Sequence, residues 1–392
     1  MVAFASMGFW VLVAVLAIVV RGLGLRGTPR AVAYGLALLA LLSPIAAWPV
    51  LAALLGIAAY GYVALRLGGG RTVFVVHIAV LSAALALSQH LVSIVGGSVG
   101  WLGWVFPLIG LPYVYLRLLH LLVEVRSGRL PLPSPLRYVV YLLPFHQLLA
   151  GPIERYGAFE AQLEAPLPPL DRRTTVAALD RLTNGLVKKY VLAELLLRGI
   201  GFTYEGSGLP LWLEVDLFAL YIYLDFSGYM DIAIGVGILI GWVPPENFNW
   251  PYLARNIIDF WKKWHITLSE WIRDYTFTPL LLNLQRGPLG SRPLMTGILS
   301  YFVSMVFCGL WHRFDLQFLL WGVLHGLGIT ACKLYETGLK KAIGRKRFKA
   351  YRKSRAAEVV AAFVTFQFVA VSFLFAFNPL PEALDIVWRL LP

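Results

Sequence analysis

Apolar stretches of nearly membrane-spanning length recur along almost the whole chain, and this feature limits the possible folds most strongly. A helix needs about 20 apolar residues to cross the hydrocarbon core of a bilayer. Hydropathy therefore predicts roughly nine to eleven spans, some of them short enough to be re-entrant. The stretches cover residues 9–20, 32–65 (enough for two spans), 73–94, 101–123, 138–150, 187–197, 211–240, 295–311, 318–334 and 359–377.

The composition agrees with a lipid environment. Of the 392 residues, 59% are hydrophobic and only 14% are charged, and the mean hydropathy is +0.71. These values lie far from the balance of soluble proteins. No internal repeat marks a boundary, so we predict an all-α integral membrane protein with interfacial amphipathic helices and one polytopic domain over residues 1–392. Arg21 and Arg26 follow the first apolar stretch in place of a cleavage site, which indicates a span that is retained.

The net charge of +13 is concentrated in short segments between the apolar stretches. Basic residues gather at 172–189, 255–273 and 340–355. The positive-inside rule predicts that such segments are cytoplasmic, which places the protein in the cell membrane as a multi-pass protein. The expected partners of these charges are anionic lipid headgroups and not nucleic acid.

The chain has two cysteines, Cys308 and Cys332, and both lie in apolar segments. We interpret them as buried thiols, and we expect neither a disulfide framework nor a metal site.

The segment 256–275 has the three-to-four-residue apolar spacing of an amphipathic helix. Trp261, Leu268 and Ile272 fall within a narrow arc at about 100° per residue. His265 lies inside this apolar arc. We therefore predict a helix along the cytoplasmic interface or beneath the spans that directs His265 inward.

His312 directly follows an apolar stretch, and Arg313 and Asp315 separate it from the next one. This pattern predicts two antiparallel spans joined by a tight polar corner. With residues 340–355 in the cytoplasm, the corner faces the opposite side, so His312 and His265 would approach one interior passage from opposite ends. His325 lies thirteen residues further, roughly 220° around a continuous helix, which favours a packing or hydrogen-bonding role.

Two carboxylates, Asp225 and Asp231, lie within a long apolar segment. Their six-residue spacing does not place them on one helix face, which disfavours a paired acid and base. A helix break near Gly228, or pairing with basic residues such as Lys188 or Arg255, is the alternative expectation, since ionisable groups in spans are costly.

Several motifs resemble one known family. The segment YLDFSGYMDIAIGVGILIGWVPPENFNWPYLARNIIDFWKKWHITLSEWIRDY (residues 223–275) is similar to the signature of membrane-bound O-acyltransferases, the MBOAT family. Further matches are FHQLLAGPIER around Gly151, GLVKKYVLAELL around Lys188, and CGLWH followed by LLWGVLHG between Cys308 and Gly326. The likeness is to the bacterial branch that includes the teichoic acid D-alanyl transfer protein and the alginate O-acetyltransferase.

The resemblance implies a ring of helices around a thin centre, where a tunnel joins a cytoplasmic thioester donor to an extracytoplasmic acceptor hydroxyl. It also implies that His312, in the LWH motif, is the catalytic base and that His265, in the WHxxLS motif, is the second essential residue. Further candidates for binding donor or substrate are Trp264, Asn256, Arg313, Asp225 and Asp231. Arg313 and Phe314 depart from the small residues that usually follow LWH in the family, and a cation beside the base would suit an anionic polymer.

In this hypothesis, the base deprotonates the acceptor hydroxyl, which attacks the thioester without a covalent enzyme intermediate. We expect no bound cofactor. The co-substrate would be acyl-coenzyme A or a phosphopantetheinyl carrier protein on the cytoplasmic side, and the acyl group acetyl or D-alanyl. Membrane lipids and an extracytoplasmic partner acyltransferase are further expected partners.

Two alternatives belong to other functional classes. A proton-coupled transporter or flippase could use the histidines and aspartates within the spans, but the lack of repeats and the amphipathic segment at 256–275 speak against it. An inactive scaffold for another acyltransferase is the second alternative. The presence of both motif histidines, His265 and His312, speaks against a scaffold.

Overall fold

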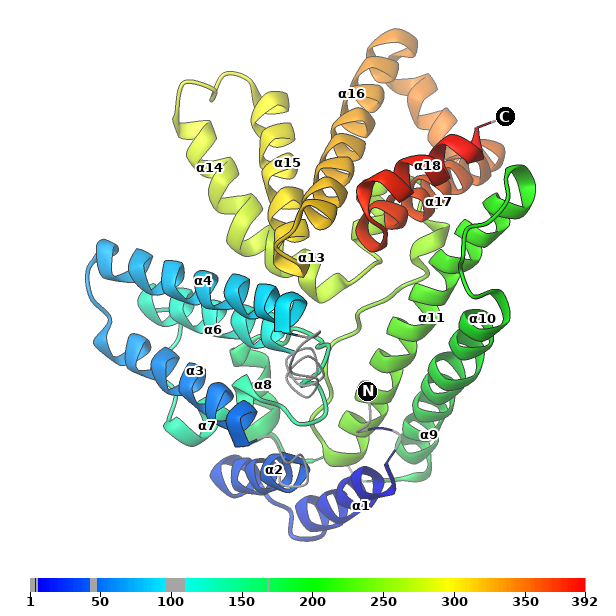
Figure 1. The fold of residues 1–392 in the computed structure, drawn as a ribbon. Coiled ribbons are helices and arrows are strands. Elements are labelled where there is room, and N and C mark those ends of the chain that lie inside the picture. Colours follow the sequence, from blue (N-terminus) through cyan, green and yellow to red (C-terminus); the bar gives the residue numbers. More distant parts are fainter. Residues whose placement is uncertain (1–3, 5, 43–47, 96–109, 168–169, 392) are drawn as a thin grey trace. The chain divides into compact units, whose positions relative to one another are not determined.

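The computed structural model describes residues 4, 6–42, 48–95, 110–167 and 170–391, with side chains throughout except at 42, 48–53 and 88–95. Within these ranges the regular structure is helical, and the β-type pairing is limited to an isolated antiparallel bridge between Phe248 and Trp264 (Figure 1). The prediction of an all-α protein is therefore confirmed.

The chain forms two compact units. Unit 1 comprises Met1–Leu186 and Tyr229–Pro245, and unit 2 comprises Val187–Gly228 and Glu246–Pro392. Helix α11 contributes its first part to unit 2 and its last part to unit 1. The helices before α11 are α1 (Met7–Gly22), α2 (Gly27–Leu42), α3 (Trp48–Leu67), α4 (Arg71–Val95), α6 (Leu111–Arg126), α7 (Pro135–Leu142), α8 (Tyr156–Glu164), α9 (Arg172–Leu186) and α10 (Ala193–Ile200). The others are α11 (Gly208–Ile240), α12 (Ile257–Trp261), α13 (Ile266–Ile272), α14 (Thr278–Arg286), α15 (Pro293–His312), α16 (Leu316–Lys353), α17 (Arg355–Phe377) and α18 (Leu380–Leu390), with π-helical turns at Val187–Leu192 and Arg273–Phe277 and a 3₁₀ turn at Pro251–Leu253.

Four of the described helices, α11, α15, α16 and α17, are long and apolar enough to cross a membrane. Shorter apolar helices occupy Met7–Gly22, Leu54–Leu67 and Arg71–Leu87. A multi-pass membrane protein is therefore confirmed. The count of nine to eleven spans and the central tunnel stay predictions, because the apolar stretch at 101–123 begins outside the described residues.

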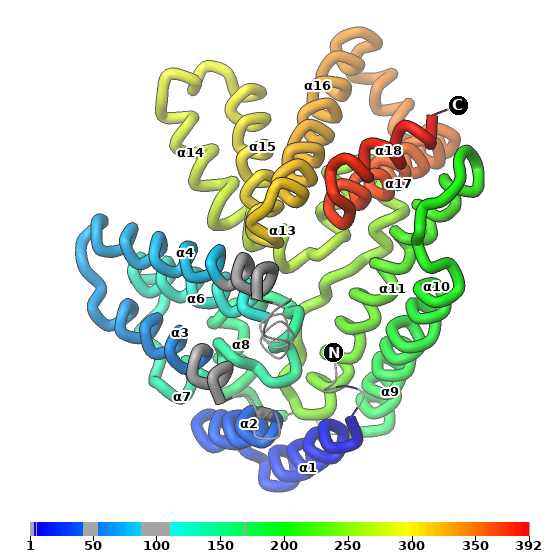
Figure 2. The backbone as a smooth tube through the Cα atoms, in the orientation of Figure 1, coloured from blue at the N-terminus to red at the C-terminus, as the bar shows by residue number. Residues whose placement is uncertain are grey.

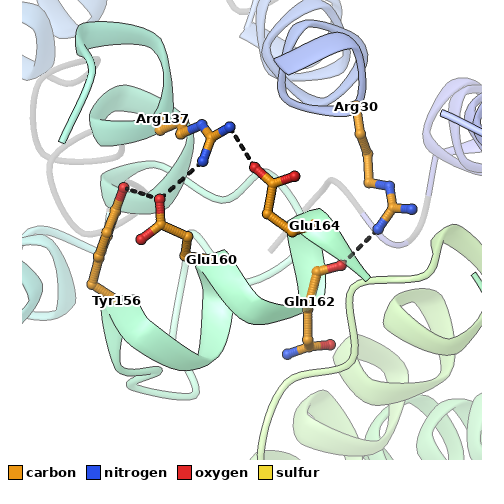
Figure 3. A network of polar contacts seen from close by, with 6 residues as sticks. All are labelled: Arg30, Arg137, Tyr156, Glu160, Gln162 and Glu164. Atoms are coloured by element: carbon orange, nitrogen blue, oxygen red, sulfur yellow. Dashed lines mark hydrogen bonds and ion pairs between the residues drawn. The ribbon is translucent and has the colours of Figure 1, made fainter. Parts of the chain in front are cut away.

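In unit 1, polar side chains fasten α8 to α2 and α7 (Figure 3). Arg137 of α7 pairs with Glu160 at 2.9 Å and with Glu164 at 2.5 Å, both on α8. Arg30 of α2 is fully buried and donates to the backbone carbonyl of Gln162 at 2.6 Å. Because hydrogen bonds satisfy these groups, the guanidinium of Arg30 is tolerated in the interior.

The loop between α7 and α8 carries a buried carboxyl, Glu154. Trp242 Nε1 and Gln162 Nε2 donate to its two oxygens at 2.7 and 2.8 Å. Burial raises the pKa of Glu154 to about 7, although these donors act in the opposite direction. Unit 1 therefore contains a group that titrates near neutral pH.

In unit 2, α15 and α16 form a hairpin and lie side by side (Figure 1). Only three residues, Arg313 to Asp315, join the two helices, and the Asp315 side chain caps α16 by accepting from Phe318 N at 2.9 Å. A Cβ atom at Gly309 would overlap the carbonyl oxygen of Phe318, and one at Gly322 would overlap that of Met305. The predicted tight polar corner is confirmed, and two glycines permit its close packing.

Helix α16 is interrupted at Gly344, where φ is +78°. After this residue the chain reverses direction toward α17, as the orange part of the tube shows (Figure 2). A left-handed φ is costly for residues with a side chain, so glycine suits this position. The basic run at 340–355 thus forms a second arm of α16 and leads into the start of α17.

Candidate active site

His312 is the last residue of α15, directly before the corner. Its imidazole is half-buried among aromatic rings of the hairpin. The ring centroids of Phe318 and Trp321 lie 5.6 and 5.5 Å from it. The hairpin therefore holds His312 in an aromatic setting at the end of a membrane-spanning helix.

His265 lies directly before α13, with a left-handed backbone (φ +45°, ψ +54°). Its ring is buried, and the Phe226 ring lies 5.0 Å away. Its Nδ1 faces Asn247 Oδ1 at 3.4 Å, and the same oxygen accepts from Thr267 N and Thr267 Oγ1, both at 2.9 Å. The backbone of Asn247 also accepts from Ile266 N at 3.0 Å. Asn247 therefore fixes the turn that carries His265.

The two imidazoles meet inside unit 2. Their ring centroids are 6.4 Å apart, although 46 intervening residues separate them in the sequence. The structure thus brings together the pair that the motifs singled out. Burial lowers the pKa of His265 well below its usual range, so this imidazole is neutral at physiological pH.

The prediction of one continuous amphipathic helix over residues 256–275 is wrong. Helix α12 ends at Trp261, and α13 begins only at Ile266. Between them the chain pairs with a segment far away in sequence: Asn249 N donates to Lys263 O at 2.9 Å, beside the bridge from Phe248 to Trp264. This pairing replaces helical hydrogen bonds. The expectation that His265 points inward is nevertheless met, because the interruption buries its ring.

His325 has the hydrogen-bonding role that was predicted for it. It is fully buried, and Trp261 Nε1 donates to its Nδ1 at 3.2 Å. Its Nε2 lies 3.0 Å from Ser372 Oγ, which itself donates to Val369 O. Nδ1 is thus the acceptor and Nε2 the donor of a neutral ring. Trp321 contacts both His325, at 4.5 Å between centroids, and His312.

Two candidates for donor binding make contacts that stabilise the fold around His265. Asn256 caps α12, since its side chain accepts from Asp259 N at 2.8 Å. Trp264 is buried and stacks with Phe260 and Tyr252, whose ring centroids lie 5.5 and 5.9 Å away. Both residues support the segment that carries His265, and a direct role in binding stays a prediction.

Arg313 lies at the corner beside His312 and is exposed. It forms an ion pair with Asp315, donates to Gln317 at 2.6 Å and lies 4.9 Å from the centroid of Phe318. Its guanidinium therefore lies at the exposed end of the hairpin, paired with Asp315.

Helix α11 runs unbroken through Gly228, so the expected helix break is wrong. The expected pairing of the two carboxylates is confirmed. Asp225 pairs with the buried Lys189 at 2.5 Å, and Asp231 pairs with Arg181 at 2.5 Å.

One of the suggested partners, Arg255, forms a different ion pair. Arg255 instead pairs with Glu358 of α17 at 2.5 Å. Six residues along a helix turn the two carboxylates to different faces, so each meets a different neighbouring element. Direct contact of Asp225 or Asp231 with a substrate stays a prediction.

The cysteine prediction holds for one residue. Cys308 is fully buried, and both thiols are free. Cys332 is only half-buried, because it lines a cavity between α16 and α17. Hydropathy alone does not distinguish the face of α16 that packs against its neighbours from the face that lines this cavity.

The sequence motifs did not single out two residues that contact the site histidines. Asn247 contacts the His265 turn, and Trp321 contacts His312 and His325. A polar residue within PPENFNW, just after a span, is a weak signal for Asn247. Trp321 was indistinguishable from any aromatic residue of an apolar helix.

Comparison with known proteins supports the same interpretation. A family model described as the membrane-bound O-acyltransferase family matches residues 72–375. The chain is 28% identical over 277 residues to a teichoic acid D-alanyltransferase of Bacillus subtilis, covering 68% of this chain and 67% of that protein. It is 31% identical over 245 residues to a peptidoglycan O-acetyltransferase of Helicobacter pylori, covering 61% and 43%.

A probable alginate O-acetylase of Pseudomonas fluorescens is 30% identical over 241 residues, which covers 60% of this chain and 45% of that protein. The match thus spans about two thirds of the first relative and less than half of the other two. These relatives favour an enzyme over the transporter interpretation. Since the family model covers well over half of the sequence, the chain belongs to the membrane-bound O-acyltransferase family and is a multi-pass membrane acyltransferase.

Proposed function

We propose that the protein transfers a D-alanyl or acetyl group from a cytoplasmic thioester donor to a hydroxyl of an extracytoplasmic cell-envelope polymer. The observation that carries the proposal is the 6.4 Å distance between the rings of His265 and His312. Both acyl groups occur in the names of relatives. The relatives also motivate the choice of a cell-envelope acceptor.

In the proposed reaction, His312 takes the proton of the acceptor hydroxyl. The oxygen attacks the thioester carbonyl, the C–S bond breaks, and the donor thiolate leaves and takes up the proton. A neutral imidazole can take up this proton and then return it to the leaving thiolate. No enzyme nucleophile is needed, because hydroxyl and thioester react directly.

His265 is proposed to position the thioester or to stabilise the charge that develops on its carbonyl oxygen. The turn held by Asn247 gives its ring a fixed direction. Trp264 and Asn256 support this turn and the preceding helix, and would act on the donor through it. Arg313, at the exposed end of the hairpin, would attract an anionic polymer.

The proposed donor is acyl-coenzyme A or an acylated phosphopantetheinyl carrier protein, with no resident cofactor. The basic segments assigned to the cytoplasm by the positive-inside rule would attract an acidic carrier. An extracytoplasmic partner acyltransferase could pass the group onward.

The experiment is acyl transfer by purified protein in nanodiscs, supplied with labelled thioesters and soluble polymer acceptors. His312→Gln should lower the rate roughly 10²–10⁴-fold, the usual contribution of base catalysis. Cys308→Ser is the matched control, because Cys308 lies one turn earlier on the same helix and has no proposed role. Near-normal transfer by a folded His312→Gln variant would overturn the assignment. Absence of transfer with every donor would favour an inactive scaffold.

A further inference from the structure

A cavity of about 920 Å³ lies in unit 2 between α12, α16 and α17. Neither His265 nor His312 lines it. Its volume is within the range of small-molecule sites, about 300–1,000 Å³. The cavity therefore has room for a ligand that the acyl-transfer mechanism does not use.

The walls of the cavity are apolar and belong to membrane-spanning helices. Leu324 and Leu327 of α16 face Ala361, Val364 and Phe368 of α17 across it. Phe368 lies thirteen residues into α17, which corresponds to a depth of about 20 Å at 1.5 Å per residue. The wall thus has the chemistry and length that suit a hydrocarbon chain.

The mouth of the cavity is polar. Arg255, two residues before α12, pairs at 2.5 Å with Glu358 in the first turn of α17. The hydroxyls of Tyr335 and Tyr351 lie 3.2 Å apart and join the two arms of α16 across the interruption at Gly344. The basic run predicted to set topology therefore also builds the rim of this cavity.

Two charged residues at the mouth have no ion-pair partner in the part of the chain that the structure describes. They are Glu336 on the first arm of α16 and Arg352 on the second, and both line the cavity. The thiol of Cys332 lines the cavity too. The mouth thus offers one carboxylate and one guanidinium.

We propose that this cavity binds a glycerophospholipid of the cytoplasmic leaflet that carries a primary ammonium, namely phosphatidylethanolamine. The Arg352 guanidinium binds the phosphate, the Glu336 carboxylate binds the ammonium, and an acyl chain lies along the α17 wall. With Arg255 and Arg352 against Glu336 and Glu358, the charges of the lining cancel, which matches a zwitterionic headgroup.

Other occupants match less well. An anionic phosphatidylglycerol would bring no cation to Glu336. The quaternary ammonium of phosphatidylcholine has no N–H group to donate. A thioester donor would need a path to His265 and His312. The fully buried His325 packs against both Phe368 of the cavity wall and Trp321, with ring centroids 5.5 and 4.5 Å away. The proposal goes beyond acyl transfer, and its test does not depend on catalytic activity.

Cys332 provides a native probe of occupancy. The full chain is placed in nanodiscs of phosphatidylcholine containing added phosphatidylethanolamine or added phosphatidylglycerol, and N-ethylmaleimide labelling is followed by peptide mass spectrometry. Cys308 is buried and serves as the internal reference. Phosphatidylethanolamine should slow labelling of Cys332 about tenfold, as expected for one or two charged hydrogen bonds. Equal rates in all nanodiscs would overturn the proposal.

Substitutions then test the headgroup contacts. Native mass spectrometry should find that Glu336→Gln and Arg352→Gln each retain about tenfold less phosphatidylethanolamine. Lys349→Gln is the matched control, because Lys349 is exposed on the same arm but does not line the cavity. Retention as strong as in the unsubstituted protein by both cavity variants would contradict the proposal.

Ala361→Trp should fill the cavity and release lipid whatever its headgroup. If this variant is unstable, the two charge variants still decide the question. Protection of Cys332 by coenzyme A, but not by phosphatidylethanolamine, would identify the cavity as a donor passage and overturn the lipid assignment.

Discussion

The two histidines of the candidate site are held in different ways. His312 ends a hairpin whose contacts with Phe318 and Trp321 span fewer than ten residues of sequence. His265 occupies a turn between short helices, and its contacts with Asn247 and Phe226 come from 18 and 39 residues earlier. One ring depends on close packing of two adjacent helices, the other on polar and aromatic contacts from distant segments.

This difference separates two kinds of sensitivity. The hairpin should respond to changes of volume, because its helices touch through glycines. The turn should respond to loss of hydrogen bonds, because it replaces regular helix with a small number of specific contacts. A substitution that changes volume in the hairpin can therefore be compared with one that removes a hydrogen bond in the turn.

The largest effect on stability is expected for Asp225→Asn. Asp225 precedes Phe226, whose ring contacts His265. The change leaves Lys189, whose side chain is only 6% exposed, without its 2.5 Å partner. Removing one member of a buried pair costs about 3–5 kcal/mol, and the 34% exposure of the Asp225 side chain places the expected loss at the lower end of this range. Thermal unfolding in detergent measures the loss. The double variant Lys189→Met with Asp225→Asn should recover much of it, and no recovery would show that the pair is not the cause.

The hairpin is tested by Gly309→Ala. The added methyl group would overlap the carbonyl oxygen of Phe318 and push α16 away, which should cost about 1–3 kcal/mol and displace His312. Gly297→Ala is the control on the same helix, because a methyl group there meets nothing within 4 Å. Thermal unfolding and acyl transfer should distinguish the two variants, and equal behaviour would show that the hairpin is not tightly packed.

The turn is tested by Asn247→Ala. This change leaves the amide of Thr267 without its 2.9 Å acceptor and frees the His265 ring, at a cost of about 1–2 kcal/mol. Asn247→Asp keeps the acceptor and should be milder. If transfer falls equally in both variants while stability is kept, Asn247 contacts the reactants and does not merely position His265.

The last prediction concerns the pH dependence of stability, and its titrating group lies in unit 1. The pKa of Glu154 is raised to about 7, so the folded protein retains its proton where the unfolded chain loses it. This contribution to stability is complete below about pH 4.5 and is lost as pH rises through about 7. Glu154→Gln should remove this loss from the pH dependence of the melting temperature. His265 acts in the opposite direction, because its ring stays neutral in the folded protein while the unfolded chain takes up a proton below about pH 6.5. An unchanged profile in Glu154→Gln would contradict this account.

Much of the architecture follows from the sequence by itself. The apolar stretches predict α11, α15, α16 and α17, because a backbone within lipid satisfies its hydrogen bonds internally as helix. Arg313 and Asp315 predict the corner after His312, since a short polar interruption between two spans leaves room only for a reversal. The motifs singled out both histidines.

Tertiary structure decided the rest. Residues 256–275 have helical spacing, yet backbone pairing with residues 247–249 interrupts the helix. The spacing within 256–275 does not reveal that another segment competes for these backbone hydrogen bonds. The partners of Asp225 and Asp231 depend on how neighbouring helices are rotated, which spacing along one helix does not specify. The cavity beside α17 exists because the chain reverses at Gly344, so that Glu336 on one arm of α16 and Arg352 on the other both line it. Local periodicity determines where helices form, whereas contacts between distant segments determine where they stop and which faces meet.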